Sequence, residues 1–172
     1  STGLAKICKA AGMSAGALYR YFPSKEAIIE AIAERDRKIA DTFLTQLKDS
    51  DNKAISISTL MEQVVLMLAE DRTYCQLSIE ISAEAARNRA IAKLIGEIES
   101  DIINALTVSI QQGQKAGYMK SDLQPELTAQ FLMMMIDGAI GQFAFKQAVD
   151  ADAIAQYVKQ SVLNLLSIEP LK

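Results

Sequence analysis

The sequence predicts an all-α protein, and three observations lead to this prediction. Hydrophobic residues recur with a period of about 3.6 in almost every segment, and no run alternates in the way that a half-buried strand does. Half of the 172 residues are hydrophobic and 23% are charged, which is typical of a well-packed chain. The length suits one medium domain, or a small module attached to a larger one.

Two short helices are predicted near the beginning of the chain. Thr2 is placed to cap a helix over about 3–10, because a hydroxyl side chain accepts a hydrogen bond from the first turn. Gly12 is the natural residue to end it, since glycine adopts the left-handed conformation at little steric cost. Ser14 then caps a second helix over about 15–21.

A long third helix is predicted over 24–47. Ser24 caps it and follows a proline, and Glu26 lies in its first turn, where the helix dipole favours an acidic side chain. The polar stretch 48–53 (KDSDNK) is the natural connector after it. We therefore expect a first module over 1–47 and a larger domain over 52–172.

The larger domain is predicted to be helical throughout. Gly117 and Pro125 lie at the two ends of its clearest turn, as C-cap and near position N1 of the next helix. The predicted helices are 56–70, 73–87, 89–116, 126–148 and 151–167.

Composition disfavours several classes of function. The chain has no histidine, so it lacks Ser-His and Cys-His nucleophiles, HExxH zinc sites and ExxH di-iron sites. No glycine-rich phosphate loop is present. We expect no catalytic site, metal or cofactor. The two isolated cysteines favour a reduced, cytoplasmic setting.

The two longest apolar stretches, 64–69 and 131–136, are too short to cross a bilayer, which needs roughly 20 residues. No signal segment opens the chain. We therefore expect no association with a membrane.

Charge is distributed unevenly, although the net charge is only −3. Residues 1–25 hold four of the 18 basic residues and none of the 21 acidic ones. A small cationic module on a larger acidic body is typical of a nucleic-acid-binding protein.

The first module matches a helix-turn-helix, in which two short helices meet at a tight turn. Leu18 and Phe22 are spaced four residues apart and can pack on the core formed with Leu4 and Ile7. This spacing turns Arg20 outward, on the helix that such modules insert into the major groove.

Each outward side chain has an expected role on DNA. Arg20 is able to make a bidentate contact with a guanine edge, whereas Tyr19 and Tyr21 reach phosphates. Lys25 adds a charge at the start of the next helix. The complete set of expected DNA-binding residues is Thr2, Ser14, Ala15, Gly16, Ala17, Tyr19, Arg20, Tyr21 and Lys25.

The stretch ICKAAGMSAGALYRYFPSKEAIIEAI, and above all its LYRYFPSKE core, resembles the DNA-binding segment of TetR-family transcriptional repressors. The resemblance implies a dimer that binds a palindromic double-stranded operator and is released by a small-molecule effector. Family members carry a further helix before the one that starts here at Thr2; it is either deleted or outside this sequence. Ala15 and Ala17 stand where the family often has longer polar residues.

Alternatives remain open at this point. A helical protein-interaction module on the same fold, which has lost DNA binding, is the leading rival. An enzyme that reuses the apolar cavity is the third hypothesis.

A homodimer interface is expected on the last two helices, as the family resemblance implies. Helix 127–147 is apolar nearly all round, which exceeds what one buried face needs. Asp137 inside it is costly unless it is bonded, and a partner across the dimer axis is one way to satisfy it. The expected interface residues are Leu132, Ile136, Asp137, Gly138, Phe143, Tyr157, Val158, Val162 and Leu165.

The larger domain is also expected to bind an unidentified, largely apolar effector. Methionines suit an adaptable apolar site. Glu62, Glu80 and Glu84 either meet a cationic effector or form a solvated acidic face, and we favour the face. The expected cavity residues are Met61, Leu68, Tyr74, Leu77, Ile81, Leu94, Ile98, Ile102, Phe131 and Met135.

Overall fold

The computed structural model of the 172-residue chain describes residues 14, 21–145 and 150–168. The expected helix 3–10 and nearly all of the expected helix 15–21 lie outside these residues. Helices account for most of the described residues, whose one β-type contact is an isolated bridge between Met119 and Ser167. The helices are α3 (Lys25–Asp49), α4 (Lys53–Glu70), α5 (Arg72–Ala85), α6 (Arg89–Lys115), α7 (Pro125–Phe145) and α8 (Ala151–Leu166).

The all-α prediction is confirmed, and several helix ends follow from single residues. Ser24 caps α3 because its hydroxyl accepts a hydrogen bond of 3.1 Å from the backbone N–H of Ala27. Gly117 follows the end of α6 with a φ of +82°, the left-handed conformation expected of a glycine there. Pro125 is the first residue of α7.

The start of α4 differs from the expectation. The helix begins at Lys53 rather than near residue 56, because the Asn52 side chain accepts hydrogen bonds from the N–H groups of Ala54 (3.0 Å) and Ile55 (3.3 Å). The polar connector is thus shorter than its composition indicates. None of the helices in the described residues is long and apolar enough to span a membrane.

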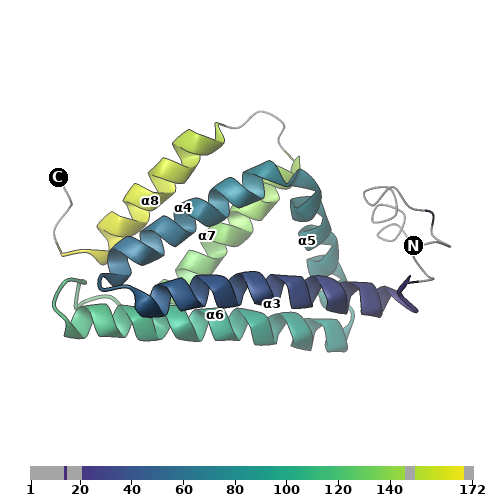
Figure 1. Ribbon diagram of the computed structural model, residues 1–172, viewed down its shortest axis with the longest axis horizontal. Helices are drawn as coiled ribbons and strands as arrows, with labels where there is room; N and C mark the ends of the chain where they lie inside the picture. The colour runs from purple at the N-terminus through teal and green to yellow at the C-terminus, as the bar shows by residue number, and fades with distance from the viewer. Residues whose placement is uncertain (1–13, 15–20, 146–149, 169–172) are drawn as a thin grey trace.

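The helices form two groups (Figure 1). The long helices α3 and α6 lie side by side along one edge of the molecule, where Arg37 and Asp101 form an ion pair of 3.5 Å. Helices α4 and α8 pack together at an angle to that edge, and α7 lies behind α4. The short α5 closes the far end, against α6 and α7.

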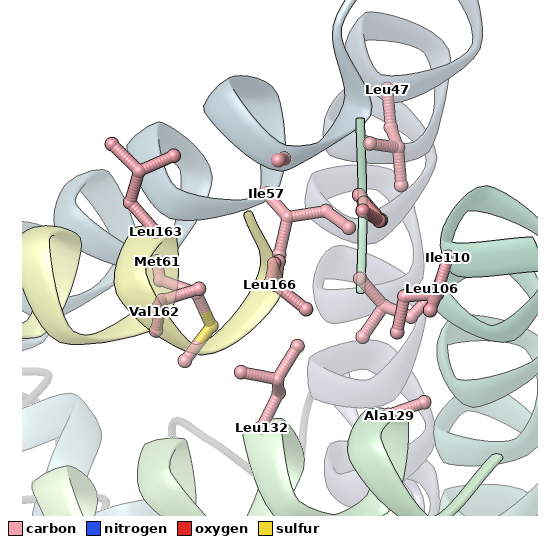
Figure 2. Packing of buried hydrophobic residues seen from close by; sticks show 12 residues of the cluster. Leu47, Ile57, Met61, Leu106, Ile110, Ala129, Leu132, Val162, Leu163 and Leu166 are labelled. Carbon is pink, nitrogen blue, oxygen red and sulfur yellow. The ribbon is translucent and has the colours of Figure 1, made fainter. Parts of the chain in front are cut away.

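The main core forms where these helices converge. Figure 2 shows Leu132 of α7 pointing toward Met61 and Ile57 of α4 and toward Leu166 of α8. Leu132 and Leu166 are fully buried. Leu47, near the end of α3, is buried in the same cluster. The core therefore fixes the C-terminal end of α3 against the rest of the chain.

A buried lysine forms the joint between α3 and α4. The side-chain ammonium of Lys53 donates hydrogen bonds to the carbonyl oxygens of Leu47 (2.7 Å), Lys48 (2.8 Å) and Ser50 (2.8 Å). The backbone N–H of Lys53 donates to the hydroxyl of Tyr118 at 3.2 Å. A cation at the C-terminus of a helix also satisfies carbonyls that have no partner within the helix.

Gly113 is required by close packing rather than by its backbone conformation. A Cβ at this position of α6 would lie 2.5 Å from Sδ of Met119, whose side chain is buried, and 2.9 Å from Cε2 of Tyr118. We expect Gly113→Ala to lower the free energy of unfolding by about 1–3 kcal/mol, despite the better helix propensity of alanine. Urea titration checks this, with Gly96→Ala, which meets no atom within 4 Å, as the control. Equal stability of the wild type and Gly113→Ala would contradict it.

Candidate functional site

The expected DNA-binding residues lie at the edge of the described part of the chain. Ser14 and Tyr21 are exposed, the latter by 65%. Lys25 is the first residue of α3. Thr2, Ala15, Gly16, Ala17, Tyr19 and Arg20 lie outside the described residues, so their roles stay predictions.

The larger domain contains a cavity of about 250 Å³ between α3, α4, α6 and α7. We call it the α4 cavity, because α4 supplies Met61, Val64 and Leu68 among its walls. Helix α3 supplies six wall residues, which are Asp36, Ile39, Ala40, Phe43, Leu44 and Leu47. The walls are overwhelmingly apolar, which suits a small-molecule site.

A second cavity, of about 420 Å³, adjoins the first and is closed by α5. We call it the α5 cavity. Ile81 and Ser82 of α5 line it, together with Ile95 and Glu99 of α6. The two cavities share wall residues from four helices, namely Asp36, Tyr74, Ile98, Ile102, Met133, Asp137 and Ile140.

Two of the shared residues form a polar pair. The hydroxyl of Tyr74 donates a hydrogen bond of 3.2 Å to Oδ1 of Asp36. Burial raises the pKa of the Asp36 carboxyl, although this hydrogen bond and the positive charge of Arg35 act in the opposite direction. Burial, reinforced by the charge of Asp36, raises the pKa of Tyr74 to about 12. Tyr74 therefore stays protonated and remains a donor.

Asp137 is the other carboxyl shared by the two cavities. It lines both cavities and is exposed to solvent, and partial burial raises its pKa. The described part of the chain supplies no hydrogen-bond or ion-pair partner to it. The sequence predicts Asp137 at the dimer interface, and the structure places it in the walls of both cavities.

The expected effector residues divide into two groups. The structure brings Met61, Leu68, Tyr74, Ile98 and Ile102 together around the α4 cavity. Ile81 lines the α5 cavity, and Met135 lines a separate apolar groove between α4, α7 and α8.

The structure does not bring the remaining three to these walls. Leu77 and Leu94 are half-buried and are not among the residues that line the two cavities. Phe131 is 50% exposed and likewise is not among the residues that line the two cavities, so its assignment to the effector site stays a prediction. The sequence does not predict the contribution of α3 to the cavity, although Ile39, Phe43 and Leu44 have the same helical spacing as the predicted wall residues.

The acidic residues considered for a cationic effector do not line the cavities. Glu62 of α4 forms an ion pair of 2.6 Å with Lys159 of α8, so its charge is compensated. Glu84 pairs with Arg87 at 3.3 Å. Within the described residues, no group of three His, Cys, Asp or Glu side chains is arranged to hold a metal ion.

The expected dimer residues need a similar correction. Leu132, Phe143 and Val162 are buried in the core of the subunit itself and have at most 6% of their surface exposed. Ile136, Val158 and Leu165 are half-buried, whereas Gly138 and Tyr157 are exposed.

A different set of apolar side chains is exposed on the last two helices. Leu127 (55%), Phe131 (50%) and Met134 (65%) lie on one face of α7, at positions i, i+4 and i+7. Phe145 and Ile154 are exposed nearby in the sequence. We call Leu127, Phe131 and Met134 the α7 outer face. The sequence could not separate it from the buried face, because α7 is apolar on both.

Two family models match the chain. Residues 1–32 match the bacterial regulatory proteins of the tetR family, a segment that extends into α3. Residues 56–167, about two thirds of the chain, match the C-terminal domain of the BetI-type transcriptional repressors.

Individual relatives agree with the family models. The transcriptional regulator UidR of Escherichia coli K12 is 24% identical over 97% of this chain and 84% of its own length. Salmonella enterica GusR has 28% identity and a TM-score of 0.66, covering 93% of this chain and 82% of its own.

Bacillus subtilis FadR, solved with stearoyl-CoA, shares the fold with a TM-score of 0.73 at 21% identity, over 94% of this chain and 87% of its own. A regulator from Saccharomonospora viridis, solved with choline, has a TM-score of 0.72 at 20% identity, over 96% of this chain and 87% of its own. The helical arrangement, the matched segments and these relatives agree: the chain belongs to the TetR family of transcriptional regulators.

Proposed function

We propose that this regulator is a repressor that binds a palindromic operator as a homodimer and leaves it when a small molecule occupies the larger domain. One observation carries the proposal. Helix α3 begins within the segment that matches the family's DNA-binding domain, and it also supplies six of the residues that line the α4 cavity. A ligand in this cavity therefore touches the helix to which the DNA-binding segment is attached.

The α7 outer face supports the proposed homodimer. Exposure of three large apolar side chains on one helical face to water is unfavourable. Packing against the same face of a second copy would bury them. Half-sites must lie roughly 34–36 Å apart for two recognition helices to enter successive major grooves. A dimer fixes this spacing, and a ligand that moves α3 changes it.

The apolar walls support a small organic effector. Two structures with the same fold hold such molecules, stearoyl-CoA in one and choline in the other. The shared fold provides the cavity, while the side chains of this chain set its preference.

The proposed DNA-binding roles predict two distinguishable mutant phenotypes. Arg20→Ala should cost about 1–3 kcal/mol of discrimination, and relax the preference for guanine at one position of each half-site, because a bidentate contact is lost. Lys25→Ala should weaken binding to all sequences equally and reduce the salt slope by about one unit. Site selection from a random DNA pool, followed by salt titration, measures both effects.

These measurements also test the proposed function. A wild-type chain that selects no motif from the pool would contradict the repressor and favour the helical interaction module. An Arg20→Ala variant that recovers the same guanine would show that Arg20 does not read a base. The chain used should include any native residues that precede Ser1.

A further inference from the structure

The two adjoining cavities carry charge of only one sign on their walls. Asp36 and Asp137 line both, and Glu99 lines the α5 cavity. No lysine or arginine is among the described residues that line either one. All other walls are apolar side chains, with Tyr74, Ser78 and Ser82 as neutral polar groups.

One cation outside the cavities, Arg35, acts on Asp36. Arg35 lies outside the cavities, with its guanidinium carbon 5.5 Å from the centre of the Tyr74 ring, and its charge reaches Asp36. Asp36 is also held by the Tyr74 hydroxyl. Asp137 has no hydrogen-bond or ion-pair partner among the described residues, although it lines both cavities. Its negative charge is therefore available to a ligand that occupies them.

An uncompensated carboxylate in apolar surroundings discriminates between ligands by charge. It repels an anion, whose own desolvation adds to the cost. It attracts a cation, because opposite charges that approach one another beside apolar walls interact favourably. A neutral ligand gains burial of its apolar surface but none of this attraction.

We propose that the effector site prefers an amphipathic organic cation, whose charged group faces Asp137 while its apolar body occupies the α4 cavity. The inference rests on the proposed function, because it names the ligand class for that same site. It also separates this chain from a neighbour of the same fold that holds an acyl-CoA, because the phosphate groups of an acyl-CoA are anionic and would face the same acidic walls.

Three probes of similar shape test the preference. Benzyltrimethylammonium carries the positive charge, neopentylbenzene replaces its nitrogen by carbon, and phenylpropanoate carries a negative charge. Isothermal titration of the wild-type chain should show that the cation binds at least about tenfold more tightly than the neutral probe, with phenylpropanoate weakest.

One substitution assigns the preference to its residue. Asp137→Asn keeps the shape of the side chain and removes its charge. It should lower the affinity for benzyltrimethylammonium by about tenfold and change the affinity for neopentylbenzene by no more than about twofold. Asp41→Asn makes the same charge change on α3 but at an exposed position that lines neither cavity, and should leave all three affinities unchanged.

The contrary outcomes are distinct. Equal binding of cation and neutral probe, tighter binding of phenylpropanoate, an absence of binding by all three, or an unchanged preference in Asp137→Asn would each overturn the cation proposal. Selection of DNA by the ligand-free wild type is measured separately. If the wild type selects an operator but lacks the charge preference, the ligand class is wrong while the repressor function stands. If it selects no DNA, the repressor proposal fails whatever the probes show.

Discussion

Replacing Met134 with glutamate is expected to produce a monomer that no longer holds its operator. Met134 is 65% exposed in the single subunit, so the substitution leaves the core intact. In the proposed dimer it would place an unpaired charge in an apolar interface, at a cost of about 3–5 kcal/mol for each copy. The dimer dissociation constant should rise by more than about 100-fold, and sedimentation velocity measures it.

The control for this substitution adds the same charge elsewhere. Gln46→Glu lies at an exposed position of α3, away from α7, and should remain dimeric. Circular dichroism should show equal helix content for both variants. A Met134→Glu protein that is still a dimer at micromolar concentration would mean that the interface lies on another face.

Replacing Lys53 with methionine is expected to lower the free energy of unfolding by about 2–4 kcal/mol. Methionine keeps the apolar length of the side chain but donates no hydrogen bond, so three carbonyl oxygens at the end of α3 lose a charged donor. Lys53 is only 8% exposed, and water cannot readily replace the ammonium. Chemical denaturation of the wild type and the variant gives the difference.

Lys48→Met provides the matched comparison. Lys48 lies in the last turn of α3 with an exposed side chain, so removal of its charge should change stability by less than about 0.5 kcal/mol. Similar losses in the two variants would show that general charge, rather than the bonds made by Lys53, stabilises the joint.

Local rules predicted the helices well, because their ends depend on single residues. Ser24, Gly117 and Pro125 act where the sequence predicts, through hydrogen-bonding or conformational preferences that need no tertiary contact. Lys53 is the contrary case. In the sequence it belongs to a polar connector. Its burial is explained only by its tertiary contacts, with carbonyl oxygens at the end of α3 and with the hydroxyl of Tyr118.

The candidate site was less predictable, because it depends on which apolar face of each helix packs in the core and which one lines a cavity or faces solvent. Helix α7 is apolar around most of its circumference, so periodicity could not distinguish buried Leu132 from exposed Phe131. For Asp137, composition indicated a cost of burial but not its location. That location depends on how α3 and α6 pack against α7, which no local pattern encodes.

The joint at Lys53 has a mechanical consequence for α3. This helix has 25 residues, and at about 1.5 Å per residue it is roughly 37 Å long, with Lys53 anchoring its C-terminal end. The walls of the α4 cavity lie along the part of this helix between Asp36 and the anchored end. A tilt of about 5° about that end would move the backbone at Leu47 very little, but it would displace the N-terminal end of α3 by about 3 Å. In the proposed repressor, a small displacement beside the cavity would therefore become a larger displacement at the end of α3 that lies within the segment matching the tetR family.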